Sequence, residues 1–403
     1  MSRRELTAAA LAVAVFFAGW AALHLPALKR DEISDLPVYQ RYGDWIEDGR
    51  VPYADFRVEY PPLALPVFAV PSFAGGGDDE YRRGFEGLMA AFGAGVVLLV
   101  ALILSRLDVA GSRLWLGLGL AALAPLLLGP VALTRFDLWP AFLTVAALAA
   151  LVCGRDRLGS VVLGLAIAAK LYPVVLLPLV VAWLWRRGGR RHALVGATLA
   201  LAVPLLAFLP FAVVGLDGVL DSVGRQLGRP LQLESLGAAI LVAGHHVVGY
   251  DLDWSSGHGS QNLDGTAAGV AAALTSILQL AVLGWLWVRF ARGPAEPERL
   301  LRYSAGALAA FVAFGKVLSP QFLLWLIPVV ALVRGRRGLA AGGLFALACV
   351  LTQVWFPRRY WDYVYEFDPL ASWAVLARDL ALAGLVVVLV GATARGRGSA
   401  RST

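Results

Sequence analysis

Two lysines lie inside long apolar stretches of this 403-residue chain, which has only three lysines in all. Lys170 stands in AIAAKLYPVVLLP and Lys316 in FGKVLSPQFLLWLIP, and a proline follows each within a few residues. A charge at membrane depth costs about 2.5–3.5 kcal/mol, so such a residue is usually paired or functional. Either both lysines extend to the outer membrane surface, or both reach one outward-facing cavity and bind an anion such as a phosphate.

Several carboxylates could act as a general base beside such an anion. Asp35 precedes segment 36–48, which is predicted to be an amphipathic helix at the membrane interface, with tyrosines and a tryptophan on its apolar face. Asp31 lies four residues earlier, and Asp55 and Glu59 follow the helix. A positioned base contributes about 10²–10⁴ in rate. Asp35 could equally cap the helix, and the local pattern leaves both roles open.

The composition indicates that membrane helices carry these residues. Hydrophobic residues make up 59% of the chain and charged residues 16%, which excludes an ordinary soluble domain. Apolar runs of about 18 or more residues recur along the chain. The first has no small-x-small cleavage site after it and is interpreted as an uncleaved helix. Cys153 and Cys349 lie in or beside apolar runs and form no metal-binding or disulfide pattern.

The arginines predict how the chain crosses the membrane. Seven basic clusters, holding 20 of the 35 basic residues, can all face the cytoplasm if an even number of crossings separates neighbours. Of the 28 carboxylates, 21 then fall in the outer segments 26–85, 215–265 and 357–379. About twelve spans result, and both termini are cytoplasmic. The spans are about 6–25, 84–105, 114–131, 136–153, 158–170, 173–186, 192–214, 266–288, 301–316, 320–333, 338–356 and 373–393.

Two stretches are predicted to fold as short broken hairpins. Segment 158–186 has arginines at both ends, so two half-length helices that meet near Lys170–Pro173 keep both ends inside. Segment 303–333 turns in the same way around Lys316–Gln321. Proline disfavours helix at the residue before it, which supports both breaks. Such helices must be buried in protein or line a wet cavity.

Five stretches between about residues 30 and 333 form a recognisable series: SDLPVYQRYGDWIEDGRVPYADFRVEYPPLALP, TRFDLWP, AIAAKLYPVVLLP, RPLQLESL and FGKVLSPQFLLWLIP. On these stretches the chain resembles glycosyltransferase family 87, polyprenol-phosphate-sugar-dependent enzymes with the GT-C membrane fold. In GT-C enzymes a carboxylate of the first large outer loop is the catalytic base. The matching residue here is Asp35, while Asp31 with Glu32 forms a second acidic pair, so both stay candidates.

The resemblance implies an inverting transfer of a sugar, with mannose favoured, from a polyprenyl phosphate to a lipid or polysaccharide acceptor. Lys170, Lys316 and Arg135 would stabilise charge on the departing phosphate. No diphosphate leaves, so neither a metal ion nor another cofactor is required. Tyr60 and Tyr172 could stack on a sugar, or could be ordinary interface aromatics.

Further substrate-binding candidates lie in the outer segments. Residues 231–243 are predicted to form a short helix whose Gln232, Glu234 and Ser235 could contact substrate. Asp251-Leu252-Asp253 matches the metal-binding D-x-D pattern and is interpreted as a coincidence. The remaining substrate-binding candidates are Asp55, Glu59, Gln321 and His258.

We expect one membrane domain, 1–393, with outer loops 26–85, 215–265 and 357–372, followed by a disordered cytoplasmic tail, 394–403. Its place would be the plasma membrane of a bacterium of actinobacterial type, with the active site on the extracytoplasmic side. Its partners would be the donor, the acceptor and membrane lipid, without nucleic acid. A secondary transporter or flippase of a lipid-linked sugar is the alternative, because broken hairpins with polar turns also occur in transporters. Only a transferase should depend on Asp35.

Overall fold

The computed structural model describes residues 1–25 and 33–391, so Asp31 and the tail 394–403 lie outside the described residues. Within this part the fold is all-α apart from one antiparallel hairpin. The α-helices are α1 (Arg3–Ala22), α2 (Leu36–Glu47), α3 (Leu65–Ser72), α4 (Asp78–Arg106), α5 (Ser112–Ala122), α6 (Ala124–Leu128), α7 (Pro130–Thr134), α8 (Leu138–Val152), α9 (Asp156–Ala169), α10 (Leu177–Leu227), α11 (Leu236–Val248), α12 (Gly265–Ala291), α13 (Pro297–Ala313), α14 (Leu323–Ala331), α15 (Gly335–Trp355), α16 (Tyr360–Glu366) and α17 (Pro369–Val390). The 3-10 helices are η1 (Pro62–Ala64), η2 (Tyr172–Leu176) and η3 (Pro320–Phe322), and the strands are β1 (Trp254–Gly257) and β2 (Ser260–Leu263).

Six helices of the described chain are long and apolar enough to cross a membrane. One of them, Tyr172–Leu227, is interrupted by non-helical backbone at Gly189 and Gly215. Shorter apolar helices such as α8 and α14 complete the bundle. The protein is therefore an all-α, multi-pass membrane protein, and the count of twelve crossings stays a prediction. The six helices are Arg3–Ala22, Asp78–Arg106, Tyr172–Leu227, Gly265–Ala291, Gly335–Trp355 and Pro369–Val390.

Both broken hairpins are confirmed. Helix α9 ends at Ala169, Lys170 is extended at φ −161° and ψ 142°, and helical backbone resumes at Tyr172. Helix α13 ends at Ala313, and η3 begins only at Pro320. Most residues of α8, α9, α13 and α14 are buried, as interrupted backbone in a membrane protein requires.

Several arginine clusters meet at one end of the bundle. Arg186 donates two hydrogen bonds, of 3.1 and 2.7 Å, to the Ala291 carbonyl at the end of α12. Arg302 and Arg337 donate to carbonyls at the end of α17. Cations at helix C-termini stabilise the unpaired carbonyl groups and the helix dipole. The clusters around residues 186, 302 and 337 therefore share one end, and which side of the membrane it faces stays a prediction.

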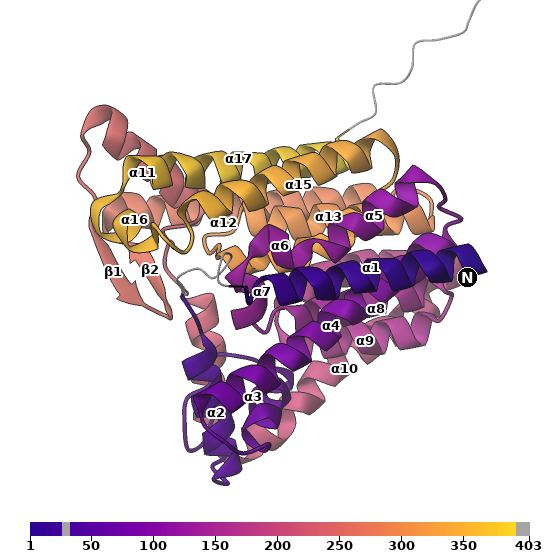
Figure 1. Ribbon diagram of the computed structural model, residues 1–403, viewed down its shortest axis with the longest axis horizontal. Helices are drawn as coiled ribbons and strands as arrows, with labels where there is room; N and C mark the ends of the chain where they lie inside the picture. The colour runs from indigo at the N-terminus through magenta and orange to yellow at the C-terminus, as the bar shows by residue number, and fades with distance from the viewer. Residues whose placement is uncertain (26–32, 392–403) are drawn as a thin grey trace, which may run out of the picture.

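Two lobes stand at the left of the bundle in Figure 1, away from the N-terminus at the right. Helices α2 and α3 form one lobe, and α11, α16 and the β1–β2 hairpin form the other. The amphipathic helix is confirmed as α2, but part of its apolar face packs on protein: Tyr39 stacks on Phe68 at 4.4 Å. Gly43 permits this contact, because a Cβ there would lie 2.4 Å from the Phe68 carbonyl oxygen.

Some predicted boundaries were wrong. The helix expected at 231–243 is α11, which starts at Leu236 with Ser235 as its N-cap. The preceding residues are held by backbone hydrogen bonds, from Gln232 N–H to the Lys316 carbonyl and from Leu233 N–H to the Gln261 carbonyl. Helix α4 begins at residue 78 rather than 84, whereas the ends predicted near residues 186 and 214 lie close to the non-helical residues Gly189 and Gly215 of α10.

Candidate active site

The predicted site residues lie where helices end. Asp35 directly precedes α2, Arg135 follows α7, Lys170 follows α9 and Lys316 follows α13. Helix ends leave backbone groups without intrahelical partners, so they are places where polar side chains can gather inside an apolar bundle. The interrupted backbone thus brings residues from distant parts of the chain to one region.

The Asp35 carboxylate forms an ion pair with the Arg135 guanidinium. Its Oδ2 also accepts a hydrogen bond from the Tyr39 hydroxyl at 3.3 Å. The Arg135 side chain is 6% exposed and the Asp35 side chain 34%. The second terminal nitrogen of Arg135 donates to the Ile33 carbonyl at 2.9 Å. A buried guanidinium thus faces a partly open carboxylate.

Asp35 does not cap α2, although it occupies the N-cap position. The Ser34 hydroxyl instead accepts the Leu36 N–H at 3.1 Å. The capping role that the local sequence left open is therefore not the role of the Asp35 side chain. The carboxylate is available for other contacts.

Lys170 forms a more enclosed ion pair with Asp137, a residue that no sequence pattern singled out. The Lys170 Nζ lies 2.6 Å from Asp137 Oδ1, and the Trp325 indole N–H donates to the same oxygen at 2.6 Å. The Nζ also lies 4.5 Å from the ring centroid of Phe136 and 5.2 Å from that of Trp325. Such cation–π contacts are strongest where water is excluded. The Lys170 side chain is 16% exposed and that of Asp137 1%.

Three stacked rings form the wall beside Lys170. Tyr172 stacks on Trp325 at 4.0 Å with an interplanar angle of 3°, and Phe322 stacks on Trp325 at 4.0 Å. The Tyr172 hydroxyl also lies 3.0 Å from the Thr144 hydroxyl. Because Tyr172 is 2% exposed, its ring presents no open face to a sugar in this conformation. We assign Tyr172 to the packing around the lysine.

The second hairpin turn joins Lys316 to the same region. Its Nζ donates to the Leu227 carbonyl at 3.1 Å, and its own carbonyl accepts the Gln232 N–H at 3.0 Å. The Gln232 side chain donates to the Ser319 hydroxyl at 2.8 Å. The turn ends at Phe322, 5.9 Å from the Lys170 Nζ, with half-buried Gln321 just before it. The two predicted hairpins therefore meet.

Arg229 is a further cation that sequence reasoning missed. Its Nε is buried and has no hydrogen-bond partner among the described residues. Its charge interacts with Glu59, Glu234 and Lys170. The only sequence signal was its place in the stretch RPLQLESL. A cation with spare donors beside Lys170 suits an anionic ligand.

Tyr60 and Glu59 line the α2 side of this region. The Tyr60 ring packs edge-on against Phe136 at 5.0 Å and Tyr39 at 5.8 Å. Burial, and then the Glu59 carboxylate, raise the pKa of the Tyr60 phenol well above its usual range, so it stays neutral. Tyr60 therefore offers a ring and a hydroxyl, without a charge.

Glu234 is buried in the other lobe. Its carbonyl accepts a hydrogen bond from Arg378 at 2.7 Å, and Arg378 forms a fully buried ion pair with Asp379 at 2.6 Å. Burial raises the pKa of Glu234 to about 7, despite the nearby cations Arg378 and Arg229. Arg378 and Asp379 escaped selection because they lie inside an apolar run, and Asp379 belongs to α17 rather than to an outer segment.

Two candidates lie on surface turns. Asp55 is exposed and accepts the Val51 N–H at 2.7 Å, which closes a turn. His258 is exposed in the turn of the β1–β2 hairpin, at φ 56°. Neither has a described contact with the Asp35–Arg135 pair or the Lys170–Asp137 pair, and their substrate-binding roles stay predictions, as does any role of Asp31. In the described ranges, histidine, cysteine and carboxylate side chains form no group of three or more that could hold a metal ion.

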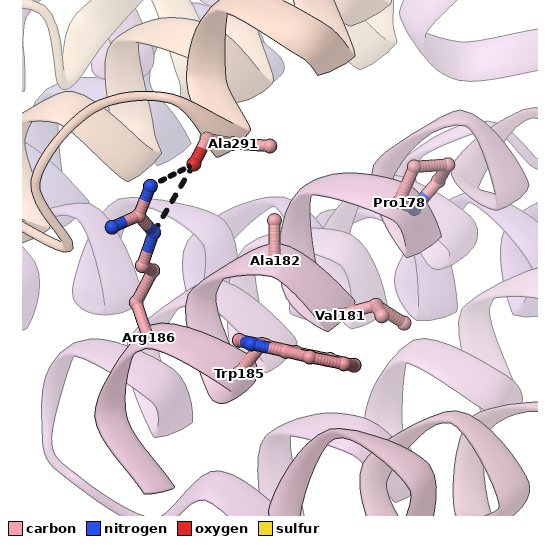
Figure 2. Close-up of a pocket in the computed structure, with 6 residues that line it drawn as sticks. All are labelled: Pro178, Val181, Ala182, Trp185, Arg186 and Ala291. Atoms are coloured by element: carbon pink, nitrogen blue, oxygen red, sulfur yellow. Dashed lines mark hydrogen bonds between the residues drawn. The ribbon is translucent and has the colours of Figure 1, made fainter. Parts of the chain in front are cut away.

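A cavity of about 600 Å³ lies at the arginine-rich end, between α10 and the end of α12 (Figure 2). Arg186 is its one charged side chain among the described residues, and it is bonded to the Ala291 carbonyl. No carboxylate of the described chain lines this cavity, so it offers no general base. Its lining is Pro178, Val181, Ala182, Trp185, Arg186 and Ala291.

Comparison with known proteins identifies a family and a fold. The family model described as "Glycosyltransferase family 87" matches residues 59–320, a range that includes Arg135, Lys170 and Lys316 but begins after Asp35. No curated protein matches the sequence. The crystal structure of ArnT from Cupriavidus metallidurans bound to undecaprenyl phosphate is similar, with a TM-score of 0.50 and 14% identity, over 95% of this chain and 76% of that chain. At this identity the likeness shows the fold alone, which is GT-C-like.

Proposed function

Because the chain belongs to glycosyltransferase family 87, we propose that it transfers a sugar from a polyprenyl-phosphate carrier to an acceptor hydroxyl at the membrane. The ArnT structure of similar fold holds undecaprenyl phosphate, which supports a donor of this class. Mannose is the sugar that the family resemblance favours. The acceptor is a lipid or a polysaccharide. No step of this transfer calls for a metal ion.

The observation that carries this proposal is the partly exposed Asp35 carboxylate, which has no capping role and lies beside a buried cation. As general base, Asp35 accepts the proton of the acceptor hydroxyl. The hydroxyl oxygen attacks the anomeric carbon from the face opposite the phosphate and inverts the configuration. The bond between that carbon and the phosphate oxygen breaks, and its electron pair leaves with the polyprenyl phosphate.

Cations at the helix ends stabilise the negative charge that develops on the leaving phosphate. Arg135 and Arg229 are the candidates for this role, each with a buried Nε that has no described hydrogen-bond partner, and Lys170 contributes its charge from inside the Asp137 pair. Lys316 is proposed to hold the phosphate through binding that is equal in the ground and transition states. Fixed cations in a site with little water need no reorganisation when the charge appears on the phosphate, so they stabilise the transition state strongly. Glu59, Tyr60 and Glu234 interact with the charge of Arg229, and Gln321 directly precedes Phe322 in the turn near Lys170. All four are proposed to contact the sugar or the acceptor.

We place the site on the extracytoplasmic side of a single domain, 1–393, with both termini cytoplasmic and about twelve crossings. The gathering of arginines around residues 186, 302 and 337 at one end of the bundle supports this orientation, since positive loops favour the cytoplasm. The proposed site lies where α7, α9 and α13 end, whereas Arg302 is near the start of α13.

The test is a transfer assay with the purified protein in vesicles. Radiolabelled polyprenyl-phosphate mannose and a bacterial lipid extract are supplied to the wild type, to Asp35→Asn and to the matched control Asp48→Asn. Asp48 is an exposed carboxylate at the end of α2. We expect label in a new lipid with the wild type and the control, and a loss of about 10²–10⁴ in rate with Asp35→Asn.

Two outcomes would contradict the proposal. Label that crosses the bilayer without being transferred, with equal rates for all three proteins, would indicate a flippase. Transfer at the wild-type rate by Asp35→Asn would leave the reaction class intact and exclude Asp35 as the base.

A further inference from the structure

We propose that the donor phosphate releases the catalytic base. In the structure Arg135 holds the Asp35 carboxylate, and the arriving phosphate takes the place of that carboxylate on the guanidinium. Base activation then depends on donor binding, and the donor binds before the acceptor is deprotonated. This inference rests on the proposed function and adds to it an order of events and a second role for Arg135.

The Arg135 guanidinium has donors to spare. Nη2 donates to the Ile33 carbonyl and Nη1 pairs with Asp35. The Nε is buried and has no hydrogen-bond partner within residues 1–25 and 33–391. A guanidinium has five N–H donors in a fixed fork that matches phosphate oxygens. A phosphate that displaces the Asp35 carboxylate can therefore occupy the donor that Asp35 uses, and the unpartnered Nε–H is a second donor of the same fork.

Asp35 is a poor base while it is paired. An opposite charge in contact with a carboxylate stabilises its ionised form and so weakens it as a proton acceptor. When a phosphate draws the guanidinium away, the Tyr39 hydroxyl at 3.3 Å is the other described partner of the carboxylate. The carboxylate is one-third exposed, so water or an acceptor hydroxyl can replace the arginine at little cost. Its affinity for a proton then rises.

The Lys170–Asp137 pair cannot exchange partners in this way. Asp137 is 1% exposed, so moving Lys170 away would leave a buried carboxylate without its counter-ion. Uncompensated buried charges are strongly destabilising. Other charged or titratable groups that act on Arg135 are Asp137, Tyr360 and Glu234, and none of them forms a described ion pair with it. Asp35 is therefore the partner that a phosphate displaces.

Donor affinity tests this exchange without any turnover. Binding of polyprenyl phosphate, which has no sugar to transfer, is measured for the protein in nanodiscs. Asp35→Asn removes the competitor, so we expect it to bind about tenfold more tightly than the wild type, within the usual range of coupling between two ligands at one site. Arg135→Gln should bind more weakly, and Asp35→Asn combined with Arg135→Gln should show no gain over Arg135→Gln alone.

Asp48→Asn is the matched control, because it removes the same charge from an exposed position near the end of α2. An equal gain in Asp48→Asn and Asp35→Asn, or a gain that survives in the double variant, would overturn the exchange. If Arg135→Gln fails to fold, Arg135→Lys replaces it in the single and double variants, and we expect changes in donor affinity in the same directions but smaller. Absence of binding by every variant would overturn the proposed donor together with this inference, whereas binding without the Asp35-specific gain overturns the inference alone.

Discussion

Two ion pairs lie in one candidate site, and they are built differently. In the Asp35–Arg135 pair the carboxylate is 34% exposed, and the guanidinium keeps a buried N–H without a described hydrogen-bond partner. In the Lys170–Asp137 pair the carboxylate is 1% exposed, and the indole N–H of Trp325 binds the same oxygen as the lysine. Aromatic rings flank that lysine. The first pair can exchange partners, whereas the second is fixed by its surroundings.

The difference supports the proposed division between a catalytic pair and a positioning pair. A residue that must change its proton or its partner during turnover needs access to water or substrate, and Asp35 has it. A buried pair of fixed geometry instead holds the backbone around it: Asp137 lies just before α8, Lys170 just after α9, and Trp325 lies in α14. We propose that the Lys170–Asp137 pair sets the shape of the site and that the Asp35–Arg135 pair performs the chemistry.

The largest expected effect is on stability, from breaking the enclosed pair. Lys170→Met leaves Asp137 buried with only the Trp325 N–H as a described partner, so we expect a loss of about 3–5 kcal/mol in the free energy of unfolding. Thermal unfolding in detergent measures it. Lys170→Met with Asp137→Asn should recover most of the loss, because the carboxamide oxygen still accepts the Trp325 N–H. If the double variant is no more stable than Lys170→Met alone, the loss of stability does not come from the unpaired Asp137 carboxylate.

The next effect concerns the open pair. Arg135→Gln removes a buried cation from the leaving phosphate, so we expect turnover to fall by about 10²–10³. Arg135→Lys keeps the charge but loses the fork, and should retain more activity. Arg41→Gln, an exposed change in α2, is the control. Wild-type turnover in Arg135→Gln would mean that the Asp35–Arg135 pair has a structural role only, like the Lys170–Asp137 pair.

Glu234 extends the comparison to a third carboxylate, which is buried like that of Asp137. Its pKa is raised to about 7 by burial, so the folded state holds a proton that the unfolded chain has released above about pH 4.5. Stability from this group is therefore present at low pH and is lost as the pH rises towards 7. Glu234→Gln should remove this loss, giving a stability advantage over the wild type that grows between pH 5 and pH 8 to at most about 3 kcal/mol.

Thermal unfolding of both proteins at the two pH values measures this advantage, with Glu47→Gln in α2 as the control. Arg378, Arg229 and Asp379 also act on the Glu234 carboxyl and remain in all variants. Parallel pH dependences of the wild type and Glu234→Gln would mean that Glu234 is ionised and paired, like Asp137.

The smallest effect is expected at Lys316. Its ammonium group binds a carbonyl rather than a carboxylate through an exposed hydrogen bond, so solvent weakens its action on a phosphate. Lys316→Ala should raise KM for the donor by about three- to tenfold, with kcat nearly unchanged, as expected for binding that is equal in ground and transition states. Steady-state kinetics separate the two constants. A lower kcat with unchanged KM would move Lys316 to the group of Arg135.

The sequence predicted most of the scaffold because hydrophobic length, arginine position and proline act locally. The breaks after Ala169 and Ala313 followed from arginines at both ends of each stretch and from Pro173 and Pro320. The family resemblance singled out Asp35, and the match to family 87 confirmed the family.

The pairing could not be predicted, because it depends on contacts between distant residues. Asp137 stands two residues after Arg135, yet its partners Lys170 and Trp325 lie 33 and 188 residues further along. Tyr172 was predicted as a possible sugar platform because an aromatic near a proposed site fits that role. Only the packed structure shows that its ring is covered by Trp325.

The most direct test measures turnover and thermal stability side by side in Asp35→Asn and Asp137→Asn. Asp35→Asn should lose about 10²–10⁴ in transfer rate and lose less stability than Asp137→Asn, because Asp35 is 34% exposed and the charge of Asp137 still acts on Arg135. Asp137→Asn should lose stability, because Lys170 then has no counter-ion in an enclosed place. The opposite result, a stable but inactive Asp137→Asn beside a fully active Asp35→Asn, would make Asp137 the base and contradict the division of roles between the two pairs.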